Sequence, residues 1–91
     1  MEYKDYRQAV EFDKELCTTI AMEESSELIQ AISKAKRGKL DRANMAEEIA
    51  DVMICMDWVM QIYDISIPDI DEWFKLKEQR IVDRLNNGDF K

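Results

Sequence analysis

The sequence of 91 residues contains no histidine, and only two glycines and one proline interrupt its regular patterns. The absence of histidine argues against imidazole-based zinc sites and against di-iron bundles built on Glu-x-x-His motifs. Few glycines and prolines leave few places where a helix would break. Because 46% of the residues are hydrophobic and 36% are charged, the composition favours helices that pack on one another.

Cysteine is also scarce, and the 20 acidic residues outnumber the 13 basic ones. Cys17 and Cys55 occur at unrelated positions, without the dense spacing of a secreted disulfide scaffold, which predicts two buried thiols in a reducing cytosol. A net charge of −7 argues against binding to nucleic acid or to an anionic membrane. The first residues lack an apolar signal core, and no run approaches the ~18 uncharged residues of a membrane span. We therefore expect a cytoplasmic protein that binds neither nucleic acid nor membrane.

Hydrophobic periodicity predicts helices that are separated by short breaks. The helices are expected at about residues 3–10, 11–36, 41–63 and 69–85, with no strong break between the first two. Gly38 suits a left-handed cap after the second helix, and Pro68 suits the first turn of the fourth. The third helix is expected to begin near Asp41 or Asn44, where Asn44 and Glu47 form a candidate capping pair.

These expectations describe one all-α domain over residues 1–91, an antiparallel bundle of about four helices. A core of this size buries only about 60–65% of the surface that the unfolded chain exposes. We therefore expect self-association to complete the bundle.

Acidic residues occur inside the apolar faces of two neighbouring helices. At about 100° per residue, Glu24 and Glu27 fall within the apolar arc of the second helix. Glu48 falls near the centre of the arc of the third helix, with Asp51 about 60° away. The i, i+3 spacing places both acids of each pair on a common face, and an antiparallel turn brings the two pairs together.

Four converging carboxylates in an apolar interior require a cation, because buried unpaired charge is costly. Oxygen ligands alone favour a hard ion, Mg²⁺ or Mn²⁺. A single i, i+3 acidic pair is most often a solvated helix face, but two such pairs inside apolar arcs favour a metal site. Glu24, Glu27, Glu48 and Asp51 are the predicted ligands.

The segments IAMEESSELIQAI and MAEEIADVMI resemble the paired signature of the MazG-like, all-α NTP pyrophosphohydrolase superfamily. That signature is Glu-Glu-x-x-Glu, a helix-turn interval, and then Glu-x-x-Asp. The residues that match it are Glu23, Glu24, Glu27, Glu48 and Asp51. The resemblance is close over the second and third helices and looser over the fourth.

The resemblance implies a helical bundle that binds Mg²⁺ through these acids. It also implies hydrolysis of nucleoside triphosphates between the α and β phosphates, and assembly as a dimer or a tetramer. Glu23 and Glu47 lie at the edges of their arcs, so we expect them to support the ligands rather than bind the ion. Glu27, with Glu24 as the second choice, is the candidate that orients the attacking water.

The fourth helix carries Lys77 within its apolar arc, flanked by Arg80 and Arg84. These cations are candidates for binding the substrate phosphates, although long basic side chains also pass over apolar surfaces to pair with surface acids. Trp58 lies on the same side of the third helix as Asp51 and is the candidate for stacking on the base. The alternative for Trp58 is an ordinary place in the core.

Two other functions fit the same sequence. Phosphoribosyl-ATP pyrophosphohydrolases have similar acidic motifs and similar length, although their N-terminal region differs from the one here. A non-catalytic acidic bundle that binds a protein partner would use the carboxylates as structural ion pairs. Substrate tests and the effect of divalent metal on the melting temperature distinguish these readings.

Overall fold

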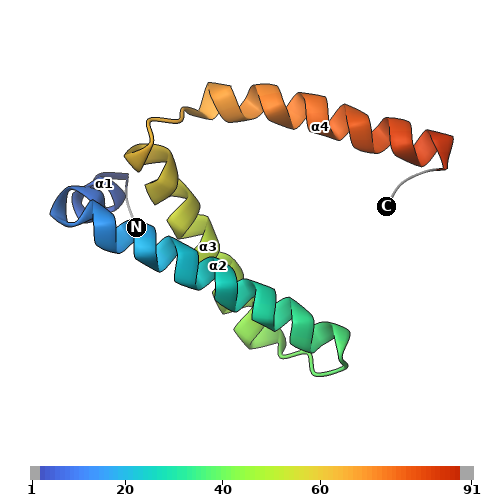
Figure 1. Ribbon diagram of the computed structural model, residues 1–91, viewed down its shortest axis with the longest axis horizontal. Helices are drawn as coiled ribbons and strands as arrows, with labels where there is room; N and C mark the ends of the chain where they lie inside the picture. The colour runs from blue at the N-terminus through green and yellow to red at the C-terminus, as the bar shows by residue number, and fades with distance from the viewer. Residues whose placement is uncertain (1–2, 89–91) are drawn as a thin grey trace.

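The computed structural model describes residues 3–88, and over that range the chain forms helices and no strand (Figure 1). The helices are α1 (Tyr3–Phe12), α2 (Lys14–Lys36), α3 (Arg42–Ile62) and α4 (Ile67–Asn87). The all-α prediction is confirmed. None of the helices in the described range is long and apolar enough to span a membrane.

Asp13 separates α1 from α2, a break that the periodicity does not predict. Its carboxylate accepts a hydrogen bond of 3.0 Å from the backbone N–H of Leu16, as an N-cap residue does. Asp41 caps α3 in the same way, accepting a bond of 3.0 Å from the N–H of Asn44. The predicted capping pair of Asn44 and Glu47 is therefore wrong, because Asn44 already lies inside the first turn of α3.

The start of α4 is a capping box. The Ser66 side chain accepts a hydrogen bond from the N–H of Asp69, and the Asp69 carboxylate accepts one from the N–H of Ser66. These bonds start the helix earlier than predicted, and Pro68 lies in its first turn, where a missing N–H costs nothing. Gly38, after α2, has the predicted left-handed backbone, with φ +79°.

Helices α2 and α3 run antiparallel side by side, and α1 contacts both near the N-terminus of α2 (Figure 1). The side chains buried between these helices are small: Cys17, Ala21, Ala31 and Cys55. The two cysteines are free, as predicted. This three-helix unit supplies the packed part of the bundle.

Helix α4 extends away from the other three and, within residues 3–88, approaches none of them (Figure 1). The radius of gyration is accordingly 16.3 Å, against about 12 Å for a compact domain of this length. The aromatic side chains of α4, Trp73 and Phe74, are each 58% exposed. One chain therefore leaves the apolar face of its fourth helix uncovered.

Candidate metal centre

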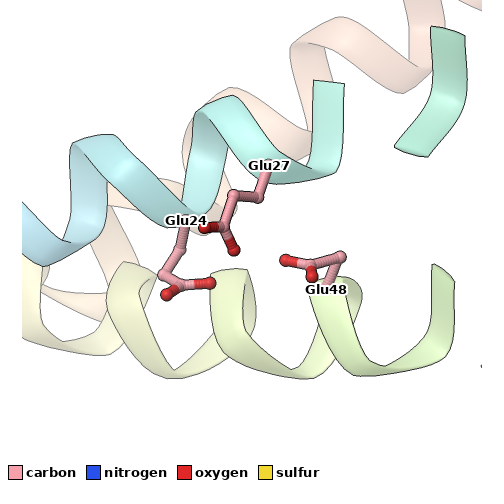
Figure 2. A group of neighbouring side chains, drawn as sticks. All are labelled: Glu24, Glu27 and Glu48. Atoms are coloured by element: carbon pink, nitrogen blue, oxygen red, sulfur yellow. The ribbon is translucent and has the colours of Figure 1, made fainter. Parts of the chain in front are cut away.

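Three glutamates meet in the space between α2 and α3. Glu24 and Glu27 extend from α2 toward Glu48, which extends from α3 (Figure 2). Each contributes a carboxylate oxygen, and the three oxygens lie within 4.8 Å of one another. A second group on α3, Glu47, Glu48 and Asp51, meets the same limit. Because Glu48 belongs to both groups, we call these five residues the carboxylate cluster.

The helical repeat and the antiparallel pairing account for this arrangement. Residues three apart share a helix face, so each helix presents two acids on one side. After burial, the charge of Glu27 on α2 is the largest cause that raises the pKa of Glu48 on α3, and among the acids of α3 Asp51 acts most strongly on the pKa of Glu24. The pairs thus oppose each other across the interface, as the sequence predicts.

Two oxygen atoms of the cluster have no hydrogen-bond partner in the described part of the chain. Glu48 is buried, with 8% of its surface exposed, and Glu24 and Asp51 are half-buried. The Oε2 atoms of Glu24 and Glu48 are buried and have no hydrogen-bond partner among the described residues. Native proteins rarely leave a buried carboxylate oxygen unsatisfied. These two oxygens are consistent with ligands of a cation.

The sequence around the cluster contains no positive charge. Residues 15–33 and 43–74 include no lysine or arginine. Within residues 3–88 no lysine or arginine forms an ion pair with a cluster carboxylate, whereas Arg7 pairs with Glu11 at 3.2 Å in α1. The cluster therefore has no counter-charge among the residues that the structure describes.

The pKa values of Glu24 and Glu48 are raised in these surroundings. Burial, followed by the charges of Glu27, Asp51 and Glu48, raises the pKa of Glu24 to about 7. Burial and the neighbouring charge of Glu27 also raise the pKa of Glu48. Both effects disfavour the ionised carboxylates in the absence of a cation. A divalent ion would reverse them, since it binds the ionised form.

The residues present fit a hard divalent cation. All of the candidate ligand atoms are carboxylate oxygens, the donor type preferred by Mg²⁺ and Mn²⁺. No imidazole is available, and the nearby thiol of Cys55 is buried with a raised pKa, first because of burial and then because of Glu24. The centre therefore suits Mg²⁺ better than zinc.

Comparison with known families identifies the family of the chain. The family model described as MazG nucleotide pyrophosphohydrolase domain matches residues 12–80, which include α2, α3 and most of α4. The chain belongs to the MazG nucleotide pyrophosphohydrolase family. No curated protein and no solved structure matches it.

The matched MazG region contains every acid that the sequence analysis selected. Glu23 and Glu47, which lie at the edges of their apolar arcs, differ in their position relative to the cluster. Glu47 contributes an oxygen to the group with Glu48 and Asp51, which its place at the edge of the apolar arc does not predict. Glu23 is exposed and belongs to neither group among residues 3–88. Its supporting role stays a prediction.

The basic residues chosen as phosphate ligands lie on α4. Lys77, Arg80 and Arg84 are exposed, and their helix approaches neither α2 nor α3 in the same chain. The structure therefore does not bring them to the carboxylate cluster of their own chain. Their role in phosphate binding stays a prediction.

Trp58 is half-buried on α3 and lines a cavity of about 380 Å³ that α1 and α2 also border. Sequence reasoning identified Trp58 but not the cavity. The missing signal is the cap at Asp13, which ends α1 and places Phe12 at the rim. An aspartate followed by a first helical turn that contains an acid, here Asp13 and Glu15, is a recognisable helix start.

Proposed function

We propose that the protein is a Mg²⁺-dependent nucleotide pyrophosphohydrolase. It would cleave nucleoside or deoxynucleoside triphosphates between the α and β phosphates, giving a monophosphate and pyrophosphate. The observation that carries this proposal is the pair of buried, unpartnered oxygens of Glu24 and Glu48 in a cluster without counter-charge, in a chain of the MazG family. We expect it to act in the cytoplasm, where buried free thiols stay reduced.

The ligands would come from both helices. Glu24 and Glu27 on α2, with Glu48 and Asp51 on α3, would hold Mg²⁺ or Mn²⁺. Glu47 is close enough to Glu48 and Asp51 to join them. When bound, the ion neutralises phosphate charge and polarises the scissile anhydride. The two carboxylates with buried oxygens fix the position of the site, because their burial between helices limits their movement.

Glu27 is the best-placed residue of α2 to orient water. It belongs to the cluster yet is exposed, so its carboxylate can accept a proton from a water that adds across the α–β anhydride. Water then supplies the new oxygen of one product, and pyrophosphate leaves with the electrons of the broken P–O bond. Glu24, half-buried beside it, is the second candidate for this role.

A panel of nucleotides tests the proposal directly. With millimolar Mg²⁺, at least one nucleoside or deoxynucleoside triphosphate is expected to give equal amounts of monophosphate and pyrophosphate, measured by ion-exchange chromatography. The panel includes phosphoribosyl-ATP, and faster turnover of that compound would transfer the assignment to the related activity. Folded protein that turns over none of the compounds with Mg²⁺ or Mn²⁺ would contradict the proposal.

The position of α4 suggests how positive charge reaches the site. We propose that α4 packs on a second copy of the chain, in a dimer or tetramer, and brings Lys77, Arg80 and Arg84 to the partner's substrate phosphates. The proposal is supported by charge complementarity, because no described lysine or arginine of the same chain pairs with the cluster. The uncovered aromatic rings of α4 supply the apolar contact.

A charge on the apolar face of α4 is expected to disrupt this assembly. Phe74→Glu should lower the molar mass measured by light scattering to that of one chain, because an unpaired carboxylate is costly in an apolar interface. Gln79→Glu adds the same charge on the opposite side of α4 and should leave the mass unchanged. A wild-type protein that is a single chain at all concentrations would refute this arrangement.

A further inference from the structure

A cavity lies at the end of the helical unit that carries the N-terminus of α2. Its volume is about 380 Å³, within the range of small-molecule sites. Helix α1 contributes Gln8 and Phe12, α2 contributes Leu16 and Ile20, and α3 contributes Trp58. Residues of α1, α2 and α3 thus all line this cavity.

The cavity is next to the carboxylate cluster. Ile20, in its wall, precedes Glu24 by one helical turn, which corresponds to a rise of about 6 Å along α2. Trp58 follows Asp51 by two turns on the antiparallel helix α3. No cluster residue lines the cavity, so a molecule whose phosphates lie on the cluster would have to extend by about one turn of α2 to reach it.

The chemistry of the wall selects an uncharged, flat group. Among the described residues that line the cavity the charged ones are Asp5 and Asp13, and none is lysine or arginine, so they offer no positive charge to a phosphate. Leu16, Ile20 and the aromatic residues make most of the wall apolar. A planar ring with polar edges fits these conditions.

Two aromatic side chains in the wall lack contacts with the rest of the protein: the ring of Phe12 is little covered, and the indole N–H of Trp58 has no hydrogen-bond acceptor among the described residues. Phe12 is 86% exposed, although a ring of this size usually packs against other atoms. The Nε1 of Trp58 is buried and has no acceptor among the described residues. A heteroaromatic ligand can cover the ring of Phe12 and offer an acceptor to a tryptophan N–H, and Gln8 offers both a donor and an acceptor.

We propose that this cavity is the nucleobase site, in which Phe12, Gln8 and Trp58 bind the base while the carboxylate cluster holds the metal and phosphates. This inference rests on the proposed function, since it assumes a nucleotide substrate. It assigns α1, most of which lies outside the family match, the role of closing the base site. Part of substrate selection is therefore placed on α1, which carries none of the proposed metal ligands, while Trp58 shares α3 with Glu48 and Asp51.

Phe12→Ala tests the proposal in the full-length protein. Loss of one aromatic contact with a base is expected to raise KM for the preferred nucleotide about tenfold, with little change in kcat. Phe12→Tyr keeps the ring and should restore KM. Tyr63→Ala removes another exposed aromatic residue, one that lies outside the cavity, and is the control. Because Phe12 is so exposed, its truncation should not alter the helical circular dichroism.

Inorganic tripolyphosphate separates base binding from phosphate binding. Its inhibition constant should be the same for wild type and Phe12→Ala, as should the stabilisation of each protein by Mg²⁺ alone. The inference is overturned if KM does not rise, if Tyr63→Ala raises it equally, or if tripolyphosphate inhibition weakens to the same extent.

A binding measurement keeps this test independent of turnover. Calorimetry with nucleoside monophosphates and Mg²⁺ should show affinity weakened about tenfold by Phe12→Ala for the monophosphate that binds wild type most tightly. Absence of pyrophosphate release by wild type would defeat the proposed activity alone. Equal affinity of wild type and Phe12→Ala for every monophosphate would defeat the base site alone.

Discussion

Glu48→Gln is expected to reduce pyrophosphate release by a thousandfold or more, because it removes a carboxylate, and a proposed metal ligand, that both groups of the cluster share. A bound divalent ion contributes several kcal/mol of transition-state stabilisation, and each ~1.4 kcal/mol corresponds to a factor of ten in rate. The glutamine has nearly the same shape, so helicity should be retained. The measurement is kcat/KM at saturating Mg²⁺, together with far-UV circular dichroism.

Glu15→Gln provides the control for this substitution. Glu15 is an exposed acid in the first turn of α2 and belongs to neither group of the cluster. The variant loses the same charge and should keep wild-type kcat/KM. If Glu48→Gln retains activity within a factor of about ten, the ion is not held at this cluster.

The metal-free protein is expected to lose thermal stability as the pH rises toward 7. The pKa of Glu24 is raised in the folded chain from 4.5 to about 7, so folding favours its protonated form. The contribution of the Glu24 carboxyl to the free energy of unfolding is complete below pH 4.5 and is lost as the pH rises through about 7. The raised pKa of Glu48 acts in the same direction. Melting temperatures in chelator between pH 5.5 and 8 measure the effect.

Magnesium should offset this loss at pH 8, where the cluster is ionised. An ion at 10 to 100 times its Kd raises the melting temperature of a domain of this size by on the order of 10 °C. The shift should be much smaller for Glu48→Gln, while Glu15→Gln should behave like wild type. No shift with millimolar Mg²⁺ or Mn²⁺ would favour a non-catalytic bundle that binds a protein partner.

The carboxylate cluster could be predicted from the sequence because it depends on two regular features. The helical repeat fixes which acids share a face, and the interval between α2 and α3 is long enough for an antiparallel return. Glu24, Glu27 and Glu48 therefore meet as expected. An oxygen of Glu47 lies beside those of Glu48 and Asp51, and whether Glu47 supports the ligands or binds the ion stays a prediction.

Helix ends were less predictable because several residues compete to cap each one. Asp41 and Asn44 are both good N-cap residues, and the backbone at Asp41, with φ −117° and ψ 104°, decides between them. The cap at Asp13 was missed because the apolar pattern continues across it. The cavity beside Phe12 depends on that cap and could not be predicted without it.

The position of α4 could not be derived from its amphipathic pattern. The pattern shows that α4 has an apolar face, but not whether that face packs on its own chain or on another. Within residues 3–88 it packs on no other helix. Lys77 and its neighbours were therefore correctly recognised as sharing a helix with this face, while their distance from the cluster was not predictable.

The separation of α4 has a consequence for how a dilute chain would melt. With no tertiary contact to another described helix, α4 behaves as an isolated peptide of 21 residues, held by its capping box and its own backbone bonds. Isolated helices unwind gradually on heating, whereas packed helices are lost cooperatively. The ellipticity of a dilute sample would then fall in a sloping phase from α4 before the sharp transition of α2 and α3.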